Sequence, residues 1–133
     1  MKFFISGSIN DSPNIKTIMK IVEETGHEVT HDWTTTDTFL SGSQEKLNNL
    51  DESRSRAKKD IDGVLSCDVY VLCSDNEKVG KGMYVELGAA IALHETRGYP
   101  AVYVIGELNH LSLFYLHETV KRRRNIQEVL QDF

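Results

Sequence analysis

Residues 68–93, DVYVLCSDNEKVGKGMYVELGAAIAL, join an apolar run, a polar loop punctuated by glycines and a second apolar stretch at helical spacing. The run between Asp68 and Ser74 predicts a strand that is buried on both faces, as in a parallel sheet. The stretch after the loop predicts a helix, and its apolar face comprises Leu87, Ala90, Ile91 and Leu93. A strand, a loop and a helix in this order indicate an α/β fold.

Glu86 lies in the first turn or so of this predicted helix, and its neighbours there are small and apolar. Open α/β sheets bind their ligands just outside the carboxyl ends of their strands, which is where this helix begins. Glu86 is therefore the leading candidate for a catalytic residue. The alternative is an acidic residue that only complements the positive end of the helix dipole.

The rest of the chain continues this alternation of strands and helices. Further strands are predicted at residues 2–6, 27–30, 101–105 and 119–122. Further helices are predicted from Pro13 to Gly26, over residues 51–66 and 111–116, and after the capping residue Asn125. This order predicts a single flavodoxin-like (Rossmann-like) α/β domain over residues 1–133. Its open parallel sheet has about five strands, with helices on both faces.

Two segments frame the predicted site. Residues 34–49 have almost no apolar period and predict a mobile loop over the site, with Trp33 and Phe39 as the large apolar groups. In the helix over residues 51–66, the predicted buried stripe comprises Ala57, Ile61, Val64 and Leu65. Asp60 lies one step from this stripe, so we expect it near the edge of the core.

Composition limits the class of protein. A chain of 133 residues forms one domain but is short for an enzyme that encloses its substrate alone, so we expect a homodimer or higher homo-oligomer. The net charge of -5 argues against a general nucleic-acid binder. Cys67 and Cys73 lie around the predicted buried strand without metal-site spacing, and no segment has the length of a membrane span or a signal-peptide core. We therefore expect a soluble, cytoplasmic protein.

Three other patterns have simpler explanations. Gly80-Lys81-Gly82 lacks the first glycine and the Ser/Thr of a Walker phosphate loop. His27 and His31 have the separation of metal ligands, but no third candidate is near, and we expect neither metal nor cofactor. The basic run at residues 121–124 is most simply an edge strand protected by its charge. A phosphate or nucleic-acid patch is the alternative there.

Three segments carry a family resemblance: FISGSI at residues 4–9, Asp60 followed by Cys67-Asp68 and the apolar strand, and GMYVELG at residues 82–88. In this order and spacing they resemble the nucleoside 2-deoxyribosyltransferase superfamily, which includes deoxynucleoside 5′-monophosphate N-glycosidases. The resemblance covers nearly the whole chain, because residues 113–117 and 125–133 are also similar to the family's ending.

The resemblance implies cleavage of the N-glycosidic bond of a nucleoside or its 5′-monophosphate, with transfer of the sugar to another base or to water. Glu86 matches the family's nucleophile, which forms a glycosyl-enzyme at the anomeric carbon. Asp60 matches the second carboxylate, which protonates the leaving base if burial raises its pKa. The expected substrate contacts are Ser6, Gly7, Ser8, Ile9, Trp33 (or Phe39, stacking on the base), Ser74, Gly80, Lys81, Gly82 and, in a neighbouring subunit, Ser112.

The chain also departs from the family. Phe4 stands where many members have a tyrosine that helps to orient the nucleophile, which leaves a non-catalytic nucleotide-binding module as an alternative. Asn10-Asp11 replaces a basic residue of the nucleotide-cleaving members. We therefore favour a nucleoside slightly over a nucleotide, although Ser112 matches a serine of their phosphate site. A TIR-like NAD glycohydrolase, which also places a glutamate on a helix beside such a sheet, is a further alternative.

Overall fold

The computed structural model describes residues 1–133 except 36–39, 41, 76 and 79. Its centre is a parallel sheet of five strands in the order β2-β1-β3-β4-β5. The strands are β1 (Lys2–Ser6), β2 (Glu28–Val29), β3 (Val69–Cys73), β4 (Ala101–Ile105) and β5 (Val120–Arg122). This strand order is that of the flavodoxin-like fold, so the predicted fold class is confirmed.

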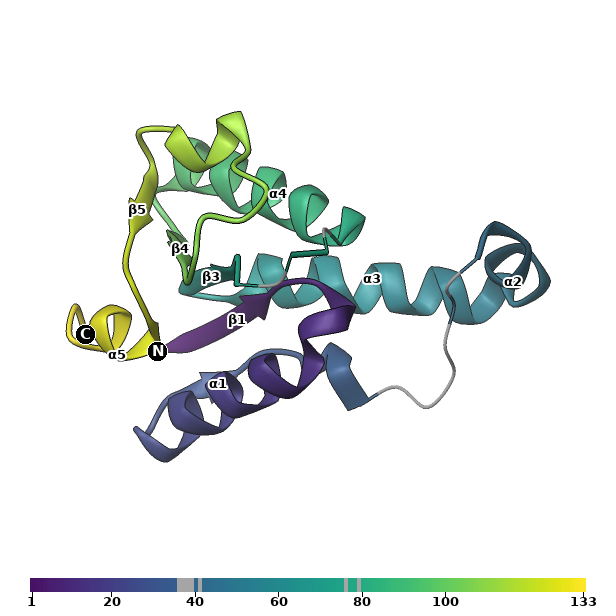
Figure 1. Ribbon diagram of the computed structural model, residues 1–133, viewed down its shortest axis with the longest axis horizontal. Coiled ribbons are helices and arrows are strands. Elements are labelled where there is room, and N and C mark those ends of the chain that lie inside the picture. The colour runs from purple at the N-terminus through teal and green to yellow at the C-terminus, as the bar shows by residue number, and fades with distance from the viewer. Residues whose placement is uncertain (36–39, 41, 76, 79) are drawn as a thin grey trace.

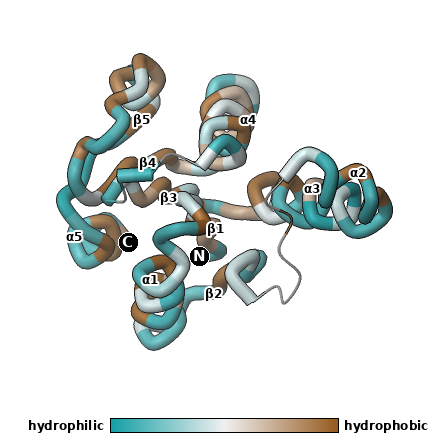
Figure 2. Tube along the Cα trace, turned by 45° about the vertical axis from the view of Figure 1, so that its right-hand side comes forward, coloured by the Kyte–Doolittle hydropathy of each residue, from teal (hydrophilic) through white to brown (hydrophobic). Residues whose placement is uncertain are grey.

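Helices cover both faces of the sheet (Figure 1). One face packs on α1 (Ser12–Glu24) and α5 (Ile126–Leu130), and the other packs on α3 (Leu50–Ser66) and α4 (Lys81–Arg97). Shorter helical turns are η1 (Ile9–Asp11), η2 (Trp33–Thr35), α2 (Ser43–Asn48) and η3 (Leu113–Leu116). Hydrophobic and hydrophilic residues are interspersed along the helices around the sheet (Figure 2), as they are when one face of a helix packs on the core.

Alternation along the strands divides the core into two layers. In β1, Phe3 and Ile5 face the α1 side, whereas Phe4 faces the α3 and α4 side. In β3 every residue is buried, because this strand is hydrogen-bonded on both edges and covered on both faces. The doubly buried strand inferred from the apolar run is therefore confirmed.

The helix ends follow the predicted signals. Pro13 lies in the first turn of α1, and Gly26, with φ of 93°, follows its last turn. The Asn125 side chain caps α5 by accepting a hydrogen bond of 3.0 Å from the Glu128 amide. Each of these residues stops or starts a helix for a local reason that can be recognised in the sequence.

Two sequence predictions need correction. Residues 43–48 form α2 rather than loop. None of its residues is buried, so it gives no apolar period, but it consists largely of good helix formers. In α3, Ala57 and Leu65 are exposed rather than buried. The inward face of α3 instead includes Gly63 and Val64, because a Cβ at position 63 would come 2.8 Å from the ring of Phe4.

Other predictions concern the edges and the cysteines. Cys67 and Cys73 are both buried and free. The strand β5 forms one edge of the sheet and carries part of the basic run. Among the described residues, no helix combines the length and apolar character that a membrane crossing requires. Phe39 lies outside the described residues.

Candidate active site

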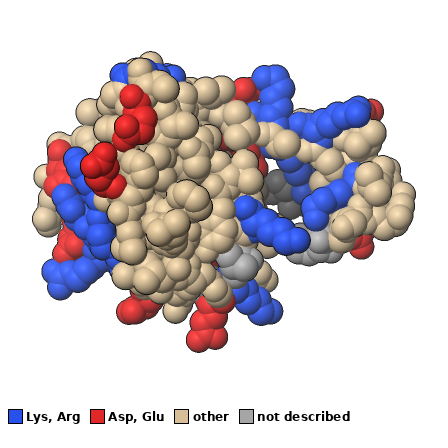
Figure 3. Space-filling view, turned by 90° about the horizontal axis from the view of Figure 1, so that it is seen from above, with Lys and Arg blue, Asp and Glu red and all other residues tan. Residues whose placement is uncertain are grey.

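A cleft of about 460 Å³ opens at the carboxyl end of the sheet, beside the start of α4. Its described lining residues are Gly7, Ser8, Ile9, Asn10, Trp33, Leu40, Lys46, Asp60, Gly80, Lys81, Gly82, Met83 and Glu86. Most of the residues that the sequence assigned to the site therefore share one cleft. The arm formed by α2 and the start of α3 extends to the right in Figure 1, and many Lys and Arg side chains lie on that side in Figure 3.

Glu86 lies in the second turn of α4, one turn further into the helix than the sequence suggested. Its side chain is buried, and its Oε1 accepts a hydrogen bond of 2.8 Å from the Ser6 hydroxyl. Burial raises the pKa of Glu86 from 4.5 to about 8. The Ser6 hydrogen bond lowers this pKa, and the charge of Asp60 raises it. Because this carboxyl group is held by β1, the helix dipole alone does not account for it.

Asp60 reaches the cleft from α3 and is about one third exposed. Burial raises the pKa of Asp60 above its ordinary value, while His31 and Arg56 act in the opposite direction. Nε2 of His31 lies 3.4 Å from Oδ1 of Asp60. The cleft therefore contains two carboxyl groups in different environments, of which Glu86 is the more deeply buried. Such a pair is typical of sites where one group acts as a nucleophile and the other as an acid.

Two glycine-containing turns form the floor of the cleft. The Ser8 side chain accepts a hydrogen bond of 3.3 Å from the Asn10 amide and caps η1. Gly80 packs directly on this turn, because a Cβ at position 80 would come 3.0 Å from the Cα of Ser8. The close approach brings the start of α4 against the end of β1. This contact places Lys81 and Gly82 on the same cleft as Gly7.

Trp33 packs against the core and also lines the cleft, and its stacking on a base stays a prediction. Its indole Nε1 donates a hydrogen bond of 2.7 Å to the carbonyl of Ile5, and its ring packs partly against both core layers. The same side chain lines the cleft. Because the hydrogen bond fixes the position of the indole, Trp33 is a rigid wall of the site.

Several cleft residues were not found from the sequence. Lys46 comes from α2, which was not predicted, and Asn10, Leu40 and Met83 are the others. Met83 was part of the family-like segment, but nothing in its residue type marked it. Lys46 and Lys81 are the cationic residues among the described lining residues of the cleft.

Three predicted substrate contacts are absent from the described lining of the cleft: Ser6, Ser74 and Ser112. Ser6 is fully buried and bonded to Glu86. The Ser74 hydroxyl is buried and donates to the carbonyls of Ile105, at 2.9 Å, and Glu107. Ser112 caps η3, where its side chain accepts a hydrogen bond of 3.2 Å from the Phe114 amide. Within one chain, all three serines have structural partners, so their roles toward a substrate stay predictions.

Phe4 does not face the cleft but lies in the core, where its ring stacks on that of Tyr70 with centroids 6.0 Å apart. The Tyr70 hydroxyl donates to the carbonyl of Met83 at 3.2 Å. A hydroxyl group from β3 therefore anchors the turn of α4 that precedes Glu86. The absence of a tyrosine at position 4 leaves Glu86 with hydrogen-bonded support from Ser6.

The histidines and the arginines of the other sequence patterns contact neighbouring side chains. His31 pairs with Asp60, and the ring of His27 packs on Phe3 at 5.0 Å. Over the described parts of the chain, no group of three or more His, Cys, Asp and Glu residues is arranged to hold a metal ion. In the basic run, Arg123 pairs with Asp132 at 2.9 Å, and Arg124 pairs with Glu128 at 2.7 Å.

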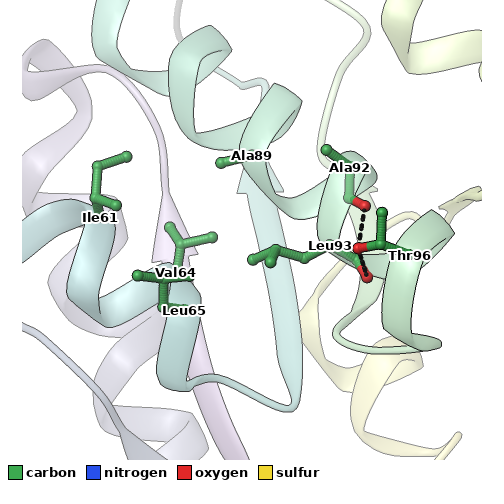
Figure 4. Close-up of a pocket in the computed structure, with 7 residues that line it drawn as sticks. All are labelled: Ile61, Val64, Leu65, Ala89, Ala92, Leu93 and Thr96. Atoms are coloured by element: carbon green, nitrogen blue, oxygen red, sulfur yellow. Dashed lines mark hydrogen bonds between the residues drawn. The ribbon is translucent and has the colours of Figure 1, made fainter.

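A second hollow, of about 280 Å³, lies between α3 and α4 (Figure 4). It is lined by Ile61, Val64, Leu65, Ala89, Ala92, Leu93 and Thr96. The Thr96 hydroxyl donates to the carbonyls of Ala92 and Leu93 at 2.9 and 3.2 Å, so it is engaged by its own helix. These seven residues include no acid, base or nucleophile for a reaction, in contrast to the first cleft.

Comparisons with known proteins bear on the fold. No family model matches this chain, and no curated protein matches it. Among solved structures, the CMP N-glycosidase BcmB of Clostridium botulinum is similar, with a TM-score of 0.54 and 18% identity over 99% of this chain and 97% of that chain. At this identity the likeness shows the fold, and it extends over both chains. The likeness therefore agrees with the fold predicted from the sequence.

Proposed function

We propose that this protein cleaves the N-glycosidic bond of a nucleoside or nucleotide through a glycosyl-enzyme on Glu86. The observation that supports this proposal best is the buried Glu86 carboxyl group, bound by Ser6, in the same cleft as Asp60. The name of the similar structure, a CMP N-glycosidase, agrees with the same bond type. The fold alone would not define an activity, because related folds carry many functions.

In the first step of the proposed reaction, the Glu86 carboxylate attacks C1′ of the sugar. The bond from C1′ to the base nitrogen breaks, and its electron pair goes to the base. Asp60 transfers its proton to the base as it leaves. The product of this step is an ester between Glu86 and C1′, and the positive charge that develops on the sugar is stabilised by the nearby carboxylate.

In the second step, water or another base attacks C1′, and the bond to Glu86 breaks. Asp60, now a carboxylate, takes the proton that the attacking group loses. The two steps together consume one acceptor and need no cofactor. Transfer to a second base requires that water be kept out of the cleft, whereas hydrolysis requires one positioned water molecule. We therefore propose cleavage of the N-glycosidic bond, and both water and a second base are to be tested as acceptors of the sugar.

The raised pKa of Glu86 has a consequence for this reaction. At neutral pH most of the unliganded protein has Glu86 protonated, because its pKa is about 8. The reactive form, with Glu86 ionised and Asp60 protonated, is then a minor population. Attack on C1′ draws on this minor form. The positive charge that develops on the sugar in the transition state stabilises the ionised Glu86. The reaction therefore depends on the protonation states of both carboxyl groups together.

For the substrate, we propose a nucleoside 5′-monophosphate rather than the nucleoside favoured from the sequence. Lys46 and Lys81 add positive charge to the cleft. The Asp11 carboxylate, which argued against a phosphate, is absent from the described lining of this cleft and accepts a hydrogen bond of 3.0 Å from Asn14. The substrate in the name of the similar structure is also a nucleoside monophosphate.

A product screen by chromatography tests the proposal. Nucleosides, their 5′-monophosphates and NAD are each incubated with the wild-type protein and with Glu86→Gln. Release of free base from a nucleoside or nucleotide by the wild type alone supports the proposal. Release of nicotinamide from NAD alone would instead support the TIR-like alternative. The absence of any released base across the panel would support the non-catalytic alternative.

Trapping of the intermediate tests the nucleophile separately. A substrate with fluorine at C2′ of the sugar slows the second step, so the sugar should remain attached to the protein. Mass spectrometry of peptides should then find the sugar on the peptide that contains Glu86. An adduct on the peptide that contains Asp60 would reverse the roles of the two carboxyl groups.

A further inference from the structure

We propose that His31 is a positioning residue for Asp60: it binds one oxygen of this carboxyl group and so directs the other oxygen toward the leaving base. The inference rests on the proposed function, because it assigns a role to the partner of the proposed acid. Nothing in the sequence indicated this pairing. There, His31 drew attention only for its separation from His27, which suggested a metal site without a third ligand.

The backbone that carries His31 is held from two sides. The Thr30 amide donates to the carbonyl of Phe3 at 2.9 Å, just past the end of β2. The Thr30 hydroxyl donates to the carbonyl of Gly63 in α3, also at 2.9 Å. These two bonds fix the residue before His31 between the sheet and the helix that carries Asp60.

Gly63 allows the close approach that the pairing needs. A Cβ at position 63 would lie 3.1 Å from the Cβ of His31 and 2.8 Å from the ring of Phe4. A larger residue would therefore push α3 away from the sheet or displace His31. Asp60 lies one turn before Gly63 on the same helix, so the contact at Gly63 also sets the distance from Asp60 to His31.

The geometry of the pair separates the two oxygens of Asp60. Nε2 of His31 lies 3.4 Å from Oδ1, and the two side chains are 26% and 33% exposed. This distance is long for an N–H···O bond, as is common in catalytic sites without substrate. Asp60 lines the cleft whereas His31 does not, so His31 contacts Asp60 from outside the cleft.

This contact suits an acid that must deliver its proton in one direction. When an N–H group of His31 donates to Oδ1, that oxygen serves as the acceptor and the acidic proton belongs on Oδ2. After transfer to the base nitrogen, Asp60 is a carboxylate, and the same N–H group stabilises it. His31 keeps its own proton throughout. The other charged groups that act on Asp60 are Arg56 from α3 and Glu86 from α4.

The test compares substrates that differ only in the leaving group. A natural base needs protonation to leave, whereas an activated group such as 4-nitrophenolate does not. We expect His31→Ala to lower kcat on the natural substrate by about tenfold to a hundredfold with little change in KM. On the activated substrate the loss should be less than about threefold. His31→Gln, which keeps an N–H donor, should retain most of the activity, and added imidazole should partly restore His31→Ala.

The controls separate this inference from the proposed function. His110→Asn replaces an exposed histidine outside the cleft with a residue that tolerates its positive φ, and it should behave as wild type on both substrates. Asp60→Asn is measured in parallel, together with the double variant. If His31 acts through Asp60, its replacement should have no further effect in the Asp60→Asn protein. Thermal unfolding verifies that each variant is folded at the assay temperature.

Three outcomes would overturn the inference in different ways. Equal losses on both substrates in His31→Ala, with a selective loss in Asp60→Asn, would leave the proposed function intact and assign His31 to structure. Unchanged activity of His31→Ala on the natural substrate would remove it from the mechanism. Equal losses on both substrates in Asp60→Asn itself would contradict the acid role of Asp60, and the inference would fail with it.

Discussion

The Ser6 hydroxyl donates a hydrogen bond of 2.8 Å to the carboxyl group of Glu86, a residue 80 positions further along the chain. The bond joins the last residue of β1 to the second turn of α4, and both side chains are buried. A buried carboxyl group with one hydroxyl donor is poorly solvated when ionised, which is why its pKa is high.

Glu86→Gln should lose activity and gain stability. Gln keeps the size of the side chain but cannot attack C1′, so kcat should fall by about three orders of magnitude or more. A carboxyl group whose pKa is raised in the folded state stabilises the fold most below its unfolded pKa. That contribution is lost as pH rises from 4.5 to about 8.

Gln does not ionise, so its contribution to stability does not change with pH. The free energy of unfolding of Glu86→Gln minus that of the wild type should therefore be about 3 kcal/mol larger at pH 7 than at pH 4. Denaturant titrations at the two pH values measure this change. Equal pH dependence in both proteins would show that Glu86 has an ordinary pKa in the fold.

The pH dependence of kcat/KM should depend on the leaving group. With a natural base the reaction needs ionised Glu86 and protonated Asp60, and Asp60, which is more exposed and faces His31, has the lower pKa. The value of kcat/KM follows the fraction of protein with ionised Glu86 multiplied by the fraction with protonated Asp60. It should therefore rise with pH up to the pKa of Asp60, stay level between the two pKa values, and fall above about pH 8. With an activated leaving group the rate needs only ionised Glu86, so it should rise up to about pH 8. Two profiles of the same shape would contradict this assignment.

Ser6→Ala should shift the ionisation of Glu86. The Ser6 hydrogen bond lowers the pKa of Glu86, so its removal should move this pKa above 8. On an activated substrate at pH 7, where the rate follows the ionised fraction, kcat/KM should fall about tenfold to a hundredfold. The rising part of the pH profile should move to higher pH by about one to two units, which corresponds to this tenfold to hundredfold change. A loss of rate without any shift in the profile would mean that Ser6 contacts the substrate instead.

Lys46→Ala and Lys81→Ala test the proposed phosphate. Each should lower kcat/KM on a nucleoside 5′-monophosphate by about tenfold, because a charge-assisted contact is lost, and should leave the nucleoside nearly unaffected. Lys58→Ala is the matched control, since Lys58 pairs with Asp62 at 2.6 Å on the exposed side of α3. If the wild type prefers the nucleoside, the substrate proposal is wrong whatever the variants do.

The exposed apolar turn η3 should form part of a subunit interface. Leu113, Phe114 and Leu116 are 78%, 58% and 69% exposed, which is unusual for three neighbouring large apolar residues on a monomer. Light scattering should find a homo-oligomer, and Leu113→Glu combined with Leu116→Glu should dissociate it. Leu47→Glu, at an exposed position on α2, is the control for oligomeric state. A fully active wild-type monomer would also exclude Ser112 from a neighbour's site.

The sequence predicted the centre of the sheet well because β1, β3 and β4 are almost entirely buried and therefore appear as continuous apolar runs. Glu86 could be placed at the carboxyl edge of the sheet because its helix follows the central strand, whereas Asp60 was assigned to the site by the family resemblance. The structure brings both to one cleft. The second strand was harder, since only Glu28–Val29 pair with β1. Its weak signal reflects how little of it is buried.

The parts that could not be predicted depend on contacts between distant segments. Leu65 belongs to an apolar pattern, yet the approach of Gly63 to Phe4 turns α3 so that Leu65 is exposed. Lys46 enters the cleft from a helix with no buried face, which leaves no periodic signal. The pairing of His31 with Asp60 requires the bond between Thr30 and Gly63, which spans 33 positions. Residue types alone contain no information about such contacts.

The short β2 has a consequence for how the protein behaves in solution. Phe3 and Ile5 point their carbonyls toward β2, and Thr30 is the last backbone amide of that ladder, bonded to Phe3. The next hydrogen bond along this edge of β1 comes from the indole N–H of Trp33, which donates to the Ile5 carbonyl. A side chain thus closes a sheet edge that would otherwise accept a strand from another molecule. A replacement of Trp33 chosen to alter the substrate would also open this edge to aggregation.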